Sequence, residues 1–68
     1  MSAVRTIYSG QRIIGVVSAG PGLFRAYLIT RDGEAVFLGS FSVESNAAEM
    51  VSLEWELMKN RARDAKAF

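Results

Sequence analysis

The chain has 68 residues, half of them hydrophobic, and a formal net charge of +1. This length leaves room for one domain, residues 1–68, with a marginal core, because so short a chain buries only about 60% of its unfolded surface. The sequence contains no Cys and no His, which excludes disulfides, Cys/His zinc sites and the usual Ser-His and Cys-His nucleophiles. We therefore expect a protein that is not an enzyme, holds no cofactor or metal, and gains stability by self-association.

The charge and the apolar runs also bear on partners and compartment. A dedicated nucleic-acid binder is usually much more basic than this chain, although the distribution of charge matters more than its sum. The longest apolar run, Ile13–Val17, is too short to span a bilayer. Because Met1–Arg5 lacks the apolar segment of a secretory signal, we expect a cytoplasmic protein with no membrane partner.

The first third of the chain predicts one weak and one stronger strand. Val4–Tyr8 contains β-branched and aromatic residues and precedes a Ser-Gly turn, so residues 1–9 are interpreted as an N-terminal arm or a weak strand. Arg12–Ser18 is rich in Ile and Val and predicts a strand. Gly15 interrupts it and indicates a bulge or a close approach of another element. The Pro-Gly pair within Ala19–Gly22 predicts a turn.

Two further strands and a helix follow. Leu23–Thr30 and Ala35–Gly39 predict strands, and Arg31–Glu34 predicts a tight hairpin with primed-turn geometry at its Asp-Gly pair. The three strands within residues 11–39 form an antiparallel meander. Residues 43–66 predict a helix that ends in basic residues, which suit the helix dipole. The predicted architecture is α+β: a three-stranded antiparallel β-meander packed against one long C-terminal α-helix.

The predicted helix has two apolar stripes. At 100° per residue one face is an ordinary core stripe, made of Ala47, Ala48, Val51, Trp55, Met58, Ala62 and Ala65. A second stripe beside it consists of Met50, Leu53, Leu57 and Phe68. One small sheet cannot cover both, and uncovered stripes of large side chains are unusual on monomers. Either the N-terminal arm folds over the second stripe, or the stripe is the interface of a homodimer, which we favour.

One stretch resembles a known family. Val36–Phe41, with the sequence Val-Phe-Leu-Gly-Ser-Phe, is followed by the pair Ala47-Ala48. This is similar to the Trp-Leu-Gly-Thr-Phe strand end and Ala-Ala helix of AP2-type domains, whose plan is shared by the arm-type DNA-binding domains of tyrosine integrases. The segment Phe24–Leu28 and the Asp32-Gly33 pair echo the family's middle strand and hairpin. The resemblance covers roughly residues 24–51 and is carried by common residues.

The shared residues are mainly determinants of the fold. Alternation places Ala26, Leu28, Val36 and Leu38 on the sheet face that packs on the helix, and Phe41 closes the core. The resemblance implies that DNA is read by the other face, where the family carries several Arg and Trp residues. The candidate ligand-binding face here consists of Arg12, Arg25, Tyr27, Ile29 and Phe37, with Ala35 where the family often has Arg.

Two functions are compatible with this pattern. The apolar outer sheet face and the second helix stripe favour a non-enzymatic interaction module, homodimeric and binding a protein partner. The resemblance and the arginines favour an AP2-like nucleic-acid-binding module that uses the outer sheet face. Because most base-reading and phosphate-anchoring side chains of the family are missing, we rank the protein-binding function first.

Overall fold

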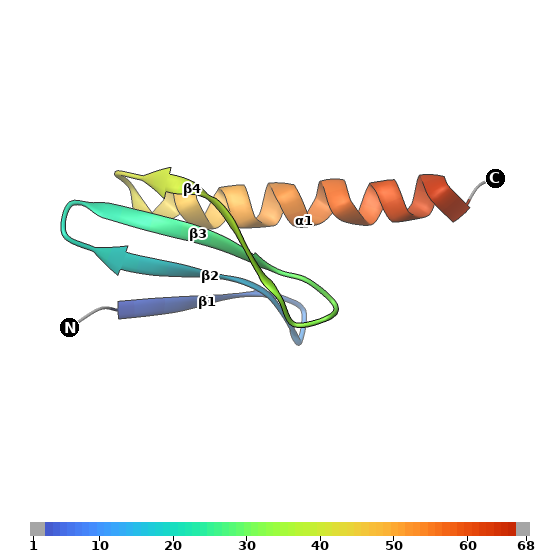
Figure 1. Cartoon of the computed structure of the whole chain (residues 1–68), viewed down its shortest axis with the longest axis horizontal. Helices are drawn as coiled ribbons and strands as arrows, with labels where there is room; N and C mark the ends of the chain where they lie inside the picture. The colour runs from blue at the N-terminus through green and yellow to red at the C-terminus, as the bar shows by residue number, and fades with distance from the viewer. Residues whose placement is uncertain (1–2, 67–68) are drawn as a thin grey trace.

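The computed structural model describes residues 3–66, with side chains described for residues 4–60. Four antiparallel strands form one sheet in the order β1-β2-β3-β4, and a single helix follows them (Figure 1). The elements are β1 (Ala3–Ser9), β2 (Arg12–Gly20), β3 (Leu23–Ile29), β4 (Ala35–Phe41) and α1 (Glu44–Lys66). The predicted α+β class and helix are confirmed, whereas the predicted number of three strands is wrong.

The additional strand is β1, which the sequence left open between an arm and a weak strand. It pairs with β2 along its whole length, from Ala3 opposite Ala19 to Ser9 opposite Arg12. The connecting turn is only two residues long, and Gly10 takes a φ of 63° in it, a conformation that favours glycine. A short turn of this kind brings the two segments together as a hairpin, so β1 is held in the sheet.

The β3–β4 hairpin forms where it was predicted, but its turn type differs. The Thr30 carbonyl oxygen accepts a hydrogen bond from the Gly33 amide at 3.0 Å, and the Thr30 hydroxyl accepts another from the Glu34 amide at 3.1 Å. Gly33 alone takes a positive φ there, at 85°. The turn therefore spans Thr30–Gly33 and is not the predicted primed turn at Asp32-Gly33. The Thr30 carbonyl and hydroxyl oxygens hold it by accepting hydrogen bonds from the amides of Gly33 and Glu34.

Two irregularities in the sheet each add one apolar residue to the core face. Ile7 pairs with Gly15 and Tyr8 with Ile13, so Ile14 is an extra residue between them. In β4, Ala26 pairs with Gly39 and Tyr27 with Phe37, so Leu38 is the extra residue. Ile14 is buried and Leu38 packs against the core. Both bulges increase the apolar surface that the sheet presents to the helix.

The core lies between the inner sheet face and α1. Its buried residues are Ile7, Ile14, Val17, Ala26, Leu28, Ala47 and Val51, and the half-buried residues Phe24, Leu38, Phe41, Ala48, Trp55 and Met58 pack against them. The prediction of a core stripe on the helix is confirmed for the residues whose side chains are described, and the side chains of Ala62 and Ala65 lie outside that set. Val36 pairs with the buried Leu28 and so lies on the predicted core face, but its side chain remains 43% exposed.

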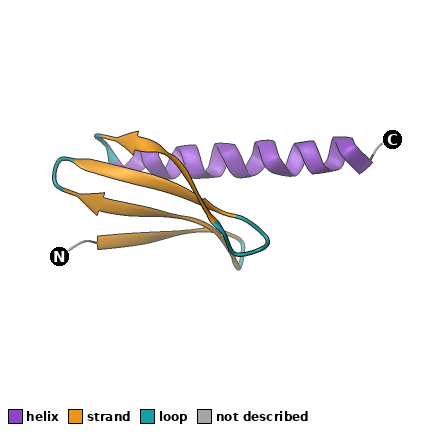
Figure 2. Ribbon diagram, in the orientation of Figure 1, coloured by secondary structure: helices purple, strands orange, loops and turns teal. Residues whose placement is uncertain are grey.

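The helix approaches the sheet closely at Gly15. A Cβ atom built at this position would overlap the Val51 side chain and the Tyr27 carbonyl oxygen. The predicted close approach at Gly15 is therefore confirmed. Helix α1 continues well past the end of the sheet (Figures 1 and 2), and the molecule measures 46 × 19 × 19 Å. Within the described residues, no helix has the length and apolar character needed to cross a membrane.

Candidate interaction surfaces

The second stripe of α1 is covered only in part by the described residues of the chain. Leu53 is 59% exposed and Leu57 is 49% exposed, while Met50 is half-buried. Phe68, the fourth predicted member, lies outside the described residues. β1 lies in the sheet and leaves both leucines exposed, so residues 4–8 do not fold over this part of the stripe. Two large leucines on one helix face are thus left in contact with solvent.

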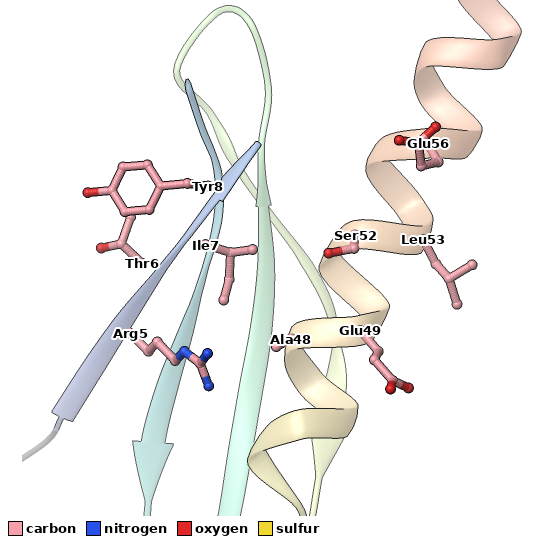
Figure 3. A pocket seen from close by; sticks show the side chains of 9 residues that line it. All are labelled: Arg5, Thr6, Ile7, Tyr8, Ala48, Glu49, Ser52, Leu53 and Glu56. Carbon is pink, nitrogen blue, oxygen red and sulfur yellow. The ribbon is translucent and has the colours of Figure 1, made fainter. Parts of the chain in front are cut away.

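A groove of about 670 Å³ runs between β1 and α1 and borders the stripe at Leu53. In Figure 3, the Arg5 and Ile7 side chains point from β1 towards the helix, whereas Tyr8 points away from it. An Arg5 guanidinium nitrogen lies 3.3 Å from a carboxylate oxygen of Glu44 at the start of the helix. The helix thus covers the inner face of β1 only partly, and an ion pair closes one end of the groove.

The outer sheet face is apolar and partly exposed. Tyr27 and Phe37 lie opposite each other on β3 and β4, with ring centroids 5.5 Å apart and an interplanar angle of 54°. Phe37 is 55% exposed, and Tyr8 on β1 is 59% exposed. Ile29 pairs with Ala35 on the same face. This arrangement brings together three of the predicted face residues, Tyr27, Ile29 and Phe37, around an aromatic pair.

The fourth predicted residue, Arg25, is exposed and lies between Ser18 of β2 and Ser40 of β4. The four strands contain no acidic residue, so Arg25 has no carboxylate beside it in the sheet. The outer face is therefore an apolar surface with a single arginine near one end. It has fewer cations than the resemblance to AP2-type domains implies.

Arg12 does not join the other predicted face residues. The bulge at Ile14 changes the alternation of β2, so that Ile13 and Val16 share the outer face with Tyr8 and Thr6. Arg12 instead lines a cleft of about 310 Å³ on the helix side of the sheet. If side chains alternated regularly from Val16 back to Arg12, both residues would lie on the outer face. The extra residue Ile14 instead puts Arg12 on the helix side of the sheet.

This cleft is a site that the sequence analysis did not identify. The start of β2, the β3–β4 turn and the middle of α1 form it, and its lining residues are Arg12, Thr30, Arg31, Asp32, Trp55, Met58 and Lys59. The ammonium group of Lys59 lies 4.7 Å from the centroid of the Trp55 ring, a cation–π contact. The cationic residues Arg12, Arg31 and Lys59 are spread over 47 positions of the chain, so no local sequence pattern indicates that they meet.

Chemistry based on titratable clusters has little support in the described part of the chain. No group of three or more Asp or Glu side chains comes together there in a way that could hold a metal ion. The single ion pair among the described side chains is Arg5–Glu44. No buried side-chain oxygen or nitrogen in that part lacks a hydrogen-bond partner.

In comparisons with protein-family models, curated proteins and solved structures, the chain matches none of them.

Proposed function

We propose that this chain is a non-enzymatic interaction module that forms a homodimer through Met50, Leu53 and Leu57 and binds a protein partner with its outer sheet face. The observation that carries the proposal is the exposure of large apolar side chains on two separate surfaces, Leu53 and Leu57 on the helix and Tyr8 and Phe37 on the sheet. Apolar and aromatic surfaces of this kind are typical of protein–protein interfaces.

The chain exposes a large surface for its size. The accessible surface of the chain is 5018 Å², whereas a compact monomer of 7.4 kDa has about 4,200 Å². The excess of about 800 Å² reflects an elongated chain with more surface than a compact monomer of this size. The radius of gyration of 12.8 Å also exceeds the value of about 11 Å for a compact chain of this length. Both differences come from the helix that extends past the sheet.

The charge pattern of α1 favours an antiparallel pair of helices. Its acidic residues lie mainly in the first half, namely Glu44, Glu49, Glu54 and Glu56, and its basic residues in the second half, namely Lys59, Arg61, Arg63 and Lys66, with Asp64 among them. A two-fold axis that sets Leu53 of one copy opposite Leu57 of the other runs the helices in opposite directions. Glu44 and Glu49 of one copy then lie level with basic residues near the end of the other helix, whereas Glu54 lies level with Glu56 near the axis. The two helix dipoles oppose each other.

Molar mass measured by light scattering tests the dimer. The native chain is expected to have twice the mass of one chain at high concentration, and Leu57→Glu is expected to halve that mass by placing two carboxylates in the interface. Ser52→Glu, an exposed position of the same helix outside the stripe, is the matched control and should stay dimeric. A native chain that remains monomeric at millimolar concentration would contradict the proposal.

The outer sheet face is tested by site-specific photocrosslinking in cells. A benzophenone amino acid at Phe37 should give crosslinked species of discrete mass, and the same group at Glu49 on the helix should not give those species. Tyr27→Arg should abolish the Phe37 crosslinks, because it breaks the apolar surface beside that position. If Phe37 and Glu49 gave crosslinked species of the same masses, the contacts would be non-specific, which would contradict a binding face on the sheet.

A second candidate function is nucleic-acid binding by the outer sheet face, as in AP2-type domains. It is favoured by Arg25, which is exposed on a face whose strands carry no acidic residue. The test is a titration of labelled duplex DNA at low salt. Binding that falls steeply with salt and weakens on Arg25→Ala would support this function, and an unchanged affinity in Arg25→Ala would exclude the outer face as the DNA-reading surface.

A further inference from the structure

We infer that the cleft between the β3–β4 turn and α1 binds a nucleotide unit, with its phosphate held by the cationic side chains and its base against Trp55 and Met58. This inference goes beyond the proposed function, because the cleft includes neither the stripe leucines nor the outer sheet face. Three elements that are distant in the chain build the cleft, so its composition is a property of the fold.

The cleft carries a net positive charge. Arg12, Arg31 and Lys59 line it together with a single carboxylate, that of Asp32. None of these four residues takes part in an ion pair among the described side chains. Three exposed cations and one carboxylate give the cleft a net positive charge, which a multivalent anion can balance. Guanidinium groups in particular present paired donors that match the oxygens of a phosphate.

The cleft also has an apolar wall. Trp55 and Met58 are both half-buried and form one wall, which leaves part of the indole accessible from the cleft. Lys59 lies over the Trp55 ring, so its ammonium group is held at the border between the charged and apolar parts. An anion with no planar group would leave the Trp55 and Met58 wall unused, whereas a base can contact the accessible part of the indole.

The volume of the cleft sets the size of the ligand. At about 310 Å³ it lies at the lower limit of small-molecule sites, which span roughly 300–1,000 Å³. This space suits one nucleotide unit. That unit is either a free nucleotide or one residue of a single strand that continues along the surface. Asp32, as a carboxylate, accepts hydrogen bonds and suits a sugar hydroxyl or a base amino group.

The chain contains one Trp, and it lies in the cleft, so tryptophan fluorescence reports directly on this site. We would titrate the full-length protein at low salt with AMP, with a ten-residue oligothymidylate and with inorganic phosphate. Saturable changes with AMP or the oligonucleotide are expected, with phosphate binding more weakly. Phosphate binding as tightly as AMP would overturn the nucleotide assignment, and so would the absence of a saturable change with AMP and the oligonucleotide up to ~10 mM.

Charge-matched variants locate the site. Arg12→Gln and Arg31→Gln should each weaken AMP binding about five-fold, the upper range for an exposed ion pair. Arg5→Gln removes the same charge from β1, outside the cleft, and should leave the affinity unchanged. Equal weakening by Arg5→Gln and Arg12→Gln would place the ligand elsewhere and overturn the inference. Circular dichroism of each variant confirms that the fold is retained.

The same titrations distinguish the two sources of the nucleotide unit. A single strand would be the ligand if the oligonucleotide binds at least ten-fold more tightly than AMP and the logarithm of its affinity falls with the logarithm of the salt concentration with a slope of about −2. That slope corresponds to three cations that contribute about 0.7 each. Equal affinity for AMP and the oligonucleotide would assign the cleft to a free nucleotide. Both results support the site, and both are independent of the molar mass that tests the dimer.

Discussion

At the scale of single residues, Gly15 decides how closely the helix packs on the sheet. Its backbone lies against the Val51 side chain on one side and the Tyr27 carbonyl oxygen on the other. Side chains can shift to make room for a methyl group, but a backbone carbonyl in a paired strand cannot do so without disturbing the ladder between β2 and β3. The position therefore requires glycine for reasons of space.

Gly15→Ala is expected to lower the free energy of unfolding by about 3 kcal/mol, the upper range for overpacking of a core. For a domain of this size the melting temperature should fall by about 15 °C. Thermal denaturation, monitored by circular dichroism, measures this fall in melting temperature. Gly22→Ala is a useful comparison, because Gly22 has no atoms near its Cβ position and its cost arises only from its φ of 71°. A loss of under ~1 kcal/mol for Gly15→Ala would contradict the close approach.

Combining Gly15→Ala with Val51→Ala separates the two contacts of Gly15. Val51 is fully buried, so Val51→Ala alone should destabilise the fold, but it removes the methyl groups that the new Cβ would meet. The double variant should be more stable than the sum of the two single effects by about 1 kcal/mol. The rescue should remain partial, since the Tyr27 carbonyl oxygen stays in place. Denaturant unfolding of all four proteins measures the coupling.

The Arg5–Glu44 ion pair should contribute little to stability. Its side chains are 59% and 44% exposed, and exposed pairs are worth a fraction of a kcal/mol. Arg5→Ala is expected to lower the free energy of unfolding by about 0.5 kcal/mol or less in urea denaturation. A loss above ~1.5 kcal/mol would show that the pair closes the groove between β1 and α1 more firmly than its exposure indicates.

At the scale of elements, the bulges set which side chains share a face. Leu38 is the extra residue of β4, and Phe37 and Gly39 on either side of it already pair with consecutive residues of β3. Deleting Leu38 should therefore regularise the strand without changing the outer face. The cost should be about 1–2 kcal/mol of unfolding free energy for the lost apolar contacts. Nuclear Overhauser effects between the Tyr27 and Phe37 rings should persist, and their loss would contradict this register.

The strands, turns and helix could be predicted from the sequence because they depend on local patterns. Pro21-Gly22 marks a turn through its own backbone preferences, and the apolar spacing of α1 predicts both of its stripes. β1 was harder, since Arg5 and Thr6 weaken its apolar pattern and its strand conformation depends on pairing with β2. The number of strands in the sheet was consequently predicted wrongly.

The faces of the sheet were predicted less well than its strands. Alternation places residues correctly until an extra residue enters, and Ile14 reverses the side on which Arg12 lies. No property of Ile14 distinguishes it from the other β-branched residues of β2. The cleft around Trp55 was missed for a related reason, because its cations come from separate elements and meet only in the folded chain.

At the scale of the whole molecule, the protein is elongated, and the proposed dimer would couple its stability to its concentration. If the antiparallel dimer forms, the melting temperature should rise with protein concentration, because association stabilises only the folded chain. Calorimetry over a hundred-fold concentration range measures this shift for the native chain, and Leu57→Glu should show none. A melting temperature independent of concentration in both proteins would contradict a dimer coupled to folding.

The separation of charge between sheet and helix has a consequence for adsorption. The charged residues of the strands are all positive, Arg5, Arg12 and Arg25, while α1 carries five carboxylates and four basic residues. The net positive charge of this nearly neutral molecule is therefore concentrated on the sheet. On a negatively charged resin or silica surface, the protein should be retained near its isoelectric point and orient with the sheet towards the surface. The helix would remain accessible to the solution.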